Sequence, residues 1–181
     1  MNDETPQWKS AFAVGAGALK AAEELLRQWQ FHVQHGTPAI ADMPADPVAR
    51  AKWLSDSERS MRGLHMWIPA GVMAGYAVEV LLKAAILENE PTGTPPHGHN
   101  LKKLWGRLPP TLRAEIGETV DGVDQVVSFA TVFDRSPSPF VDWRYLYEPD
   151  DSRSLTGTGW LVQVGRMLQA YLQKQLATRR T

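Results

Sequence analysis

A long and almost uninterrupted apolar segment lies near the middle of the chain. Residues 71–87 are glycine or aliphatic at every position except Tyr76, Glu79 and Lys83. Alanine, leucine and methionine are frequent there and favour helix, so we expect a helix over residues 71–89 that is buried on nearly every side. It should be the central element against which the other helices pack.

Apolar residues also recur at helical spacing near the N-terminus. A helix is predicted to start at Thr5-Pro6, because a hydroxyl residue followed by proline is a typical start, and to run to about His35. One side carries positions spaced alternately four and three residues apart, which suits antiparallel packing. These positions are Trp8, Phe12, Gly15, Leu19, Ala22, Leu26, Trp29 and Val33.

Prolines, glycines and capping residues divide the rest of the chain into shorter helical segments. A helix should begin at Pro47 and break just before Pro69, and Asn100 should cap a helix over 101–108. Two helices divided by Gly117 and Gly122 are expected within 111–134, and a last helix over 158–177. No strand pattern of useful length occurs, so the predicted fold class is all-α, in one domain covering residues 1–181.

Composition narrows the function classes. The chain has no cysteine, which excludes disulfides, thiolate nucleophiles and cysteine-ligated zinc. Residues 1–6 are acidic where a signal peptide would be basic, and the longest stretch without a charged residue, 63–78, is too short for a membrane span. We therefore expect a soluble, cytoplasmic protein.

Charge and motif content exclude several kinds of site. With a net charge of −1, binding to nucleic acid would need a local patch, and residues 101–113 hold four basic side chains and no acidic one. The same cluster is also typical of a solvated helix face.

No hydrolase or nucleotide-binding glycine motif follows a strand, and no cofactor is expected. His32 and His35 lack a third ligand, so no metal site is predicted.

Four residues of the central segment lie on one ridge of the helix. Gly71, Gly75, Glu79 and Lys83 are four residues apart, and the glycines permit close approach of another backbone. Glu79 and Lys83 have the favourable i,i+4 order of a solvated ion pair. Alternatively Glu79 lines a polar groove or a subunit interface, because burying an unpaired carboxylate costs several kcal/mol.

Two further segments are candidates for a site. His99 directly precedes the helix cap Asn100, and it is either an exposed loop residue or part of a site. Residues 142–148 mix aromatic and charged side chains in a loop bounded by prolines. They are either anchors that hold the loop against the bundle or a second part of the same site.

Three motifs in this order resemble the HEPN domain, a small all-α bundle of prokaryotes and eukaryotes. They are GYAVEVLLKA at 75–84, GHNLKKL at 98–104 and Arg144-Tyr145 before a final helix. The resemblance covers residues 58–177, with the helix at 5–35 as an addition. It implies an up-and-down antiparallel bundle of about five to seven helices that forms a homodimer. HEPN proteins include metal-independent endoribonucleases of toxin–antitoxin and phage-defence systems, and noncatalytic members that partner nucleotidyltransferases.

The chain departs from the family at the catalytic motif. Catalytic HEPN ribonucleases carry an arginine followed after four to six residues by histidine near the start of the last helix, whereas residues 152–181 contain no histidine. Arg59 and His65 have this spacing but precede the central helix. Two functions therefore stay open. The first is an RNA- or nucleotide-associated protein with ribonuclease activity, whose partner would be RNA, a nucleotide, an antitoxin or a nucleotidyltransferase. The second is a noncatalytic helical interaction module.

A ribonuclease site can be composed from these side chains. His99 or His65 would transfer protons, and Arg144 would hold the phosphate. Glu79 would line the same groove. The residues expected to bind the substrate are Lys83, Lys102, Lys103, Tyr145 and Tyr147, and the weaker catalytic candidate is Arg59 with His65.

Overall fold

A computed structural model describes residues 6–35, 43–64, 66–90, 96–121, 138 and 158–178. Throughout these residues the regular structure is helical, which confirms the all-α prediction. The helices are α1 (Gln7–His35), α2 (Pro47–Leu64), α3 (Trp67–Asn89), α4 (Leu101–Gly106), α5 (Pro110–Asp121) and α8 (Thr158–Thr178).

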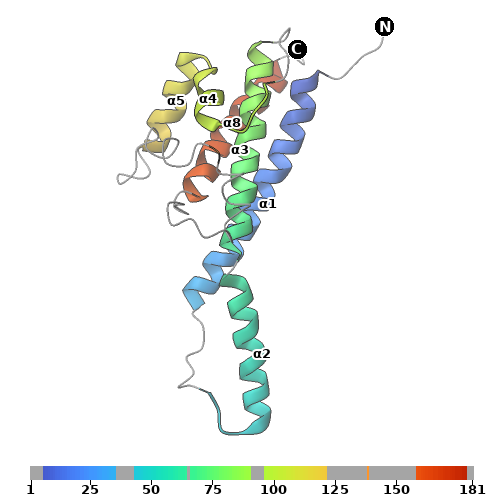
Figure 1. The fold of residues 1–181 in the computed structure, drawn as a ribbon, viewed down its shortest axis with the longest axis vertical. Helices are drawn as coiled ribbons and strands as arrows, with labels where there is room; N and C mark the ends of the chain where they lie inside the picture. Colours follow the sequence, from blue (N-terminus) through green and yellow to red (C-terminus); the bar gives the residue numbers. More distant parts are fainter. Residues whose placement is uncertain are drawn as a thin grey trace.

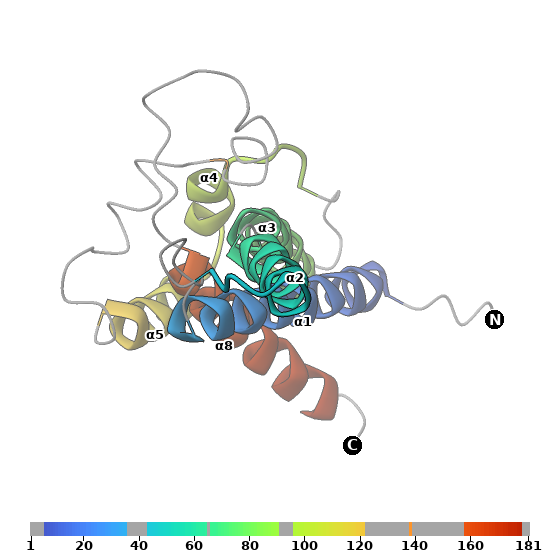
Figure 2. The ribbon, with the colours of Figure 1, turned by 90° about the horizontal axis from the view of Figure 1, so that it is seen from below.

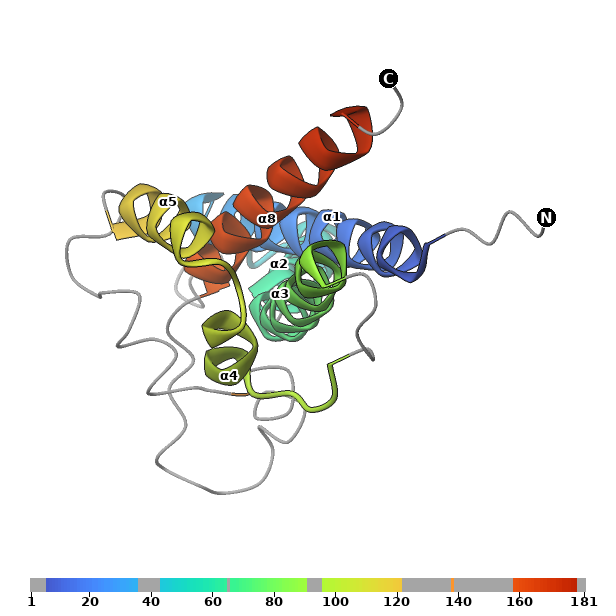
Figure 3. The ribbon, with the colours of Figure 1, turned by 90° about the horizontal axis from the view of Figure 1, so that it is seen from above.

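Helix α3 is the centre of the bundle, as its apolar sequence predicts. It packs against α1, α4 and α8, and α1 runs beside it in the opposite direction (Figure 1). Viewed along the bundle, α1 and α8 lie on one side of α3 and α4 lies on another (Figure 3). Most of its residues are buried on several faces, including Val78, Leu82 and Ile86. Burial of each such side chain contributes about 1.5–3 kcal/mol to folding, before the entropy cost of ordering the chain.

The N-terminal helix packs into the same core as the other helices. Trp8, Leu19 and Ala22 of α1 join one buried cluster with residues of α3 and α8. Two glycines allow the helices to approach closely. A Cβ at Gly15 would lie 2.8 Å from Leu81 Cγ of α3, and one at Gly165 of α8 would lie 2.7 Å from Leu19 Cδ1. The predicted apolar side of α1 thus packs on two helices at once.

The helix boundaries follow the capping and proline signals closely. Helix α2 begins at Pro47 and ends before Pro69, as expected. The side chain of Asn100 accepts a hydrogen bond from the Lys103 backbone N–H at 2.9 Å, which confirms the predicted N-cap of α4. Of the two glycines predicted to divide two helices, Gly117 lies within α5, which continues to Asp121, whereas Gly122 and the second helix lie outside the described residues. A single glycine costs a helix only about 1 kcal/mol, which neighbouring helical residues can offset.

The first helix extends beyond the core, and α2 extends further still. On the predicted apolar side of α1, Trp8, Gly15, Leu19 and Ala22 are buried and Phe12, Leu26 and Trp29 are half-buried, but Val33 is exposed. Helix α2 packs on α1 and continues roughly along the line of α3 (Figures 1 and 2). Its outer face shows Val48, 81% exposed, and Leu54. The prediction of burial along the whole of α1 is therefore wrong for its last turns.

Helix α3 is long and apolar enough to cross a membrane by length and composition alone. The sequence predicted that no stretch is long enough for a membrane span, because it counted only segments without charged residues. Helix α3 has 23 residues and meets the length and composition criteria although it contains Glu79 and Lys83. However, 72% of its most apolar 18-residue window is buried inside the bundle. Core helices of soluble proteins pass the same test of length and composition.

Candidate functional site

The buried carboxylate of Glu79 is the centre of the candidate site. Its side chain is 4% exposed although it stands on the most apolar helix of the bundle. The alternative in which Glu79 and Lys83 form an ordinary solvated pair is thereby excluded. A buried carboxylate needs partners, because an uncompensated one costs several kcal/mol.

Two cationic or polar groups supply these partners. Lys83 Nζ lies 2.7 Å from Glu79 Oε1, one helical turn further along α3. His99 Nδ1 lies 3.0 Å from both Oε1 and Oε2, so the ring faces the carboxylate evenly. The structure thus brings together three of the side chains that were expected to share a site, Glu79, Lys83 and His99.

The local structure of residues 96–101 holds His99 in place. Gly98 has φ +92°, a backbone conformation that glycine adopts readily and other residues rarely do. Asn100 then caps α4, and Leu101 is buried in the core directly after it. His99 is therefore held between a turn and a capped helix, which limits the positions that its ring can take.

The contact with the carboxylate is made by Nδ1 of the His99 ring. An ionised carboxylate only accepts hydrogen bonds, so Nδ1 is the donor when Glu79 is ionised. The imidazole is 55% exposed while its carboxylate partner is buried. A buried carboxylate that orients an accessible imidazole is the arrangement that general acid–base catalysis uses.

Basic side chains lie next to this cluster on α4. Lys102 and Lys103 follow the cap of the helix and are exposed. At the other end of α4, Arg107 donates to Glu90 Oε2 at 2.6 Å and joins α4 to the end of α3. The ammonium of Lys83 is engaged by Glu79, so its first role is to neutralise that carboxylate. Of the predicted binding residues, Lys102 and Lys103 are the two exposed lysines of α4, close to His99 in the sequence.

Most of the remaining predicted site residues belong to segments outside the described part of the chain. His65, Arg144, Tyr145 and Tyr147 lie outside the described residues, as does the loop 142–148. The backbone of Arg59 belongs to α2, whereas its side chain lies outside the described part. The arginine–tyrosine half of the site therefore stays a prediction. Within the described residues, no group of three histidine or acidic side chains could hold a metal ion.

The sequence did not indicate a second polar network, on the opposite face of α3. Glu88 is buried, and Tyr171 of α8 donates to its Oε2 at 2.8 Å. Asn89 Nδ2 donates to the same tyrosine oxygen at 2.9 Å. The available signal was Glu88 itself, a second carboxylate on an apolar helix, but its partner lies 83 residues away and nothing in the spacing indicates it.

Comparison with protein-family models, with curated proteins and with solved structures found no match to this chain.

Proposed function

We propose that the protein is a HEPN-like, cytoplasmic protein that associates with RNA or nucleotides and cleaves RNA without a metal, as a component of a toxin–antitoxin or phage-defence system. The observation that carries the proposal is the hydrogen bonding of the half-exposed His99 to the buried Glu79 carboxylate, with both oxygens at 3.0 Å. The order of the three motifs supports it further. In this proposal the protein acts as a homodimer, with an antitoxin or nucleotidyltransferase as partner.

The proposed chemistry is attack of a ribose 2′-oxygen on the adjacent phosphorus. Nε2 of His99 takes the 2′-hydroxyl proton, the 2′-oxygen bonds to phosphorus, and the P–O5′ bond breaks as the leaving 5′-oxygen takes a proton from water. The products are a 2′,3′-cyclic phosphate and a 5′-hydroxyl. Glu79 stabilises the imidazolium that forms at His99, and Lys83 balances the charge of Glu79. Lys102 and Lys103 offer positive charge to the phosphates, a role that Arg144 would share.

A noncatalytic interaction module is the second candidate, and the burial of Glu79 favours it. A carboxylate that is only 4% exposed and holds both Lys83 and His99 can serve solely to fasten residues 96–100 to α3. In that case His99 stabilises the fold, and the bundle serves as a scaffold for a protein partner. The two candidates differ in what a substitution of His99 does to RNA cleavage.

Cleavage of labelled RNA in EDTA distinguishes them. We expect His99→Ala to abolish cleavage and Glu79→Gln to reduce it about 100-fold or more, since general acid–base catalysis contributes roughly 10²–10⁴-fold. His97→Ala is the matched control, because His97 is an exposed histidine two residues away in the same loop. It should cleave as the wild-type protein does.

Two results would decide against the enzyme. Equal, contaminant-level cleavage by the wild type and by His99→Ala would leave the noncatalytic module. A loss of cleavage in His97→Ala as large as that in His99→Ala would mean that the loop, and not the Glu79–His99 pair, is responsible. Unfolding curves of all variants would show whether the fold is retained.

A further inference from the structure

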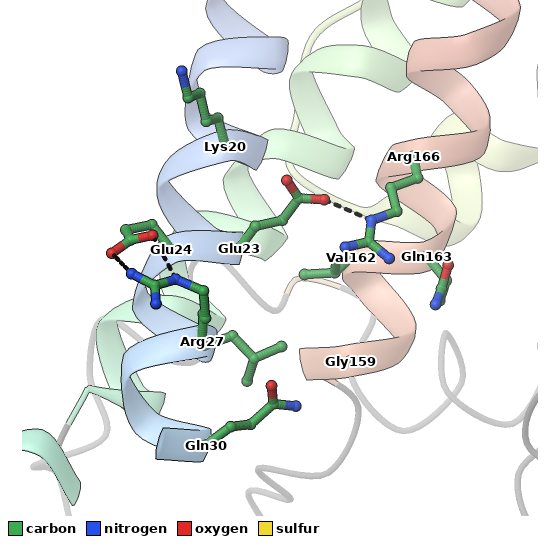
Figure 4. Close-up of a pocket in the computed structure, with 10 residues that line it drawn as sticks. Lys20, Glu23, Glu24, Arg27, Gln30, Gly159, Val162, Gln163 and Arg166 are labelled. Carbon is green, nitrogen blue, oxygen red and sulfur yellow. Dashed lines mark hydrogen bonds and ion pairs between the residues drawn. The ribbon is translucent and has the colours of Figure 1, made fainter. Parts of the chain in front are cut away.

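A groove between α1 and α8 lies apart from the His99 site and has a different chemical character. Its volume is about 850 Å³, which is within the roughly 300–1,000 Å³ typical of small-molecule sites. Figure 4 shows α1 on one side and α8 on the other, with Glu23 and Gln30 of α1 and Arg166 of α8 directed toward the space between them, whereas Lys20 points away from α8. The lining residues are Lys20, Glu23, Glu24, Leu26, Arg27, Gln30, Gly159, Val162, Gln163 and Arg166.

The charged side chains of the groove leave positive groups in excess. Three are basic and two are acidic. Both acidic groups are already engaged: Glu23 accepts from Arg166 Nε at 2.6 Å, and Glu24 accepts from Arg27 at 2.7 and 3.0 Å. The groove therefore has one positive charge more than it neutralises internally, and an anion would balance it.

Arg166 supplies the donors for that anion. Arg166 uses only its Nε for Glu23, so in the described part of the molecule its two terminal nitrogens make no hydrogen bond. The fixed fork of a guanidinium matches a phosphate or a carboxylate with two parallel hydrogen bonds. Figure 4 shows Arg166 extending from α8 toward Glu23, whereas the ammonium of Lys20 points away from Arg166. Among the described residues Lys20 forms no ion pair, so it adds positive charge at the edge of the groove.

The remainder of the groove suits an apolar body with polar edges. Leu26 and Val162 provide aliphatic surface from the two helices. Gln30 and Gln163 each add an amide that both donates and accepts. Gly159 leaves room at the beginning of α8, since a Cβ built there would meet nothing within 4 Å. The groove thus offers hydrogen-bond donors for an anion in one part and apolar surface in another, which suits a ligand with an anionic group and an apolar body.

We infer that the groove between α1 and α8 binds a small organic phosphate, with the phosphate on the terminal nitrogens of Arg166 and the apolar body on Leu26 and Val162. This inference does not depend on the proposed ribonuclease function. None of the groove residues belongs to the Glu79–Lys83–His99 cluster. Either proposal can therefore fail while the other stands.

The test uses phenyl phosphate and inorganic phosphate as probes, added at low salt to the ¹⁵N-labelled full-length protein. The expected amide shift changes lie in residues 20–30 of α1 and 159–166 of α8. Phenyl phosphate should bind at least tenfold more tightly than inorganic phosphate, because only the former contacts Leu26 and Val162. Equal affinities, or shift changes centred on residues 97–107, would overturn the inference.

Substitutions separate ligand binding from the ion pair between the helices. Arg166→Ala should weaken phenyl phosphate binding at least tenfold. Glu23→Gln breaks the same ion pair but keeps the guanidinium and removes a competing carboxylate, so it should bind the probe at least as tightly as the wild type. If both variants lose binding equally, Arg166 is only a structural link and the inference fails.

Two matched controls complete the experiment. Arg107→Ala also removes an exposed arginine from a 2.6 Å ion pair between two elements, but far from the groove, and should leave binding unchanged. Gly159→Leu should fill the groove and abolish binding, whereas Gly17→Leu, another glycine with open space around it, should not. His99→Ala should bind phenyl phosphate like the wild type. Unchanged binding in Gly159→Leu would contradict the proposed position of the apolar body.

Discussion

The Glu79 carboxylate illustrates how much one buried charge depends on its partners. Lys83→Met removes the ammonium at 2.7 Å and leaves a nearly buried carboxylate with His99 alone. We expect the free energy of unfolding at pH 7 to fall by about 2 kcal/mol, less than for a fully buried pair because Lys83 is partly exposed. The double variant Glu79→Gln/Lys83→Met should recover part of this loss, since an amide needs no counter-charge. Urea denaturation measures both, and an unchanged midpoint for Lys83→Met would show that the pair adds no stability.

Glu24, in contrast, is an exposed carboxylate whose partners change its titration. Hydrogen bonds from Arg27 and then Gln28 lower the pKa of Glu24 from 4.5 to about 2. Because the folded pKa is the lower one, the interaction is fully present above about pH 4.5 and is lost as the pH falls toward 2. A ¹³C NMR titration should give a midpoint near 2 for the wild type and a clearly higher one for Arg27→Gln. Added salt should also raise the wild-type midpoint, because the pair is exposed to solvent.

At the scale of the elements, two glycines of α1 that are two residues apart should respond in opposite directions to alanine. At Gly15 a Cβ would lie 2.8 Å from Leu81 Cγ and 3.2 Å from the Leu81 backbone nitrogen, so α1 and α3 would have to separate. Overpacking of about 1–3 kcal/mol should exceed the gain in helix propensity of about 1 kcal/mol, and the net loss should be about 1–2 kcal/mol. At Gly17 nothing lies within 4 Å, so alanine should stabilise the protein by up to about 1 kcal/mol.

Chemical denaturation of the two variants provides the comparison, with each serving as the control for the other. A stabilising Gly15→Ala would mean that the helices repack at no cost. Gly165→Ala should be less harmful than Gly15→Ala, because its close contacts are all with the side chain of Leu19, which can rotate away.

The elements were predictable where the signal is local. Pro47 and Asn100 indicated helix starts that the structure confirms, since capping and the missing proline donor act within one turn. The spacing along α1 indicated its buried side but not that Gly15 would meet Leu81, because a periodic pattern does not identify the helix that packs against it. Val33 continues the apolar spacing of α1 but is exposed, because the spacing also does not show where the neighbouring helices end.

At the scale of the whole molecule, the candidate site was predictable only in part. Glu79 and Lys83 are one turn apart, and His99 was indicated by its place before the cap Asn100, so these three could be selected before their contact was known. The ion pair between Glu23 and Arg166 joins residues 143 positions apart, and both are ordinary charged residues on amphipathic helices. Such a groove forms only when two helices are packed, so the sequence alone does not indicate it.

The uneven packing of the molecule predicts uneven stability along the chain. Helix α3 is covered by α1, α4 and α8, whereas α2 packs on α1 and extends away from the rest of the bundle (Figure 1). Amide hydrogen exchange in α3 should require global unfolding, while α2 should exchange faster through local opening. The cost of substituting side chains should follow the same order, with larger losses of stability in α3 than in α2. Val48→Ser on α2 should change the free energy of unfolding by less than about 0.5 kcal/mol, and Leu82→Ala in α3 should cost about 2–5 kcal/mol.

Equal protection of the two helices would contradict this order, and it would mean that the outer face of α2 is covered in solution. Dilution then separates two causes of such covering. Protection of α2 that falls with protein concentration would come from a second copy of the chain, in agreement with the proposed homodimer. Protection that is independent of concentration would come from contacts within one chain. In either case Val48→Ser would become destabilising by more than about 0.5 kcal/mol, because Val48 would no longer be exposed to water.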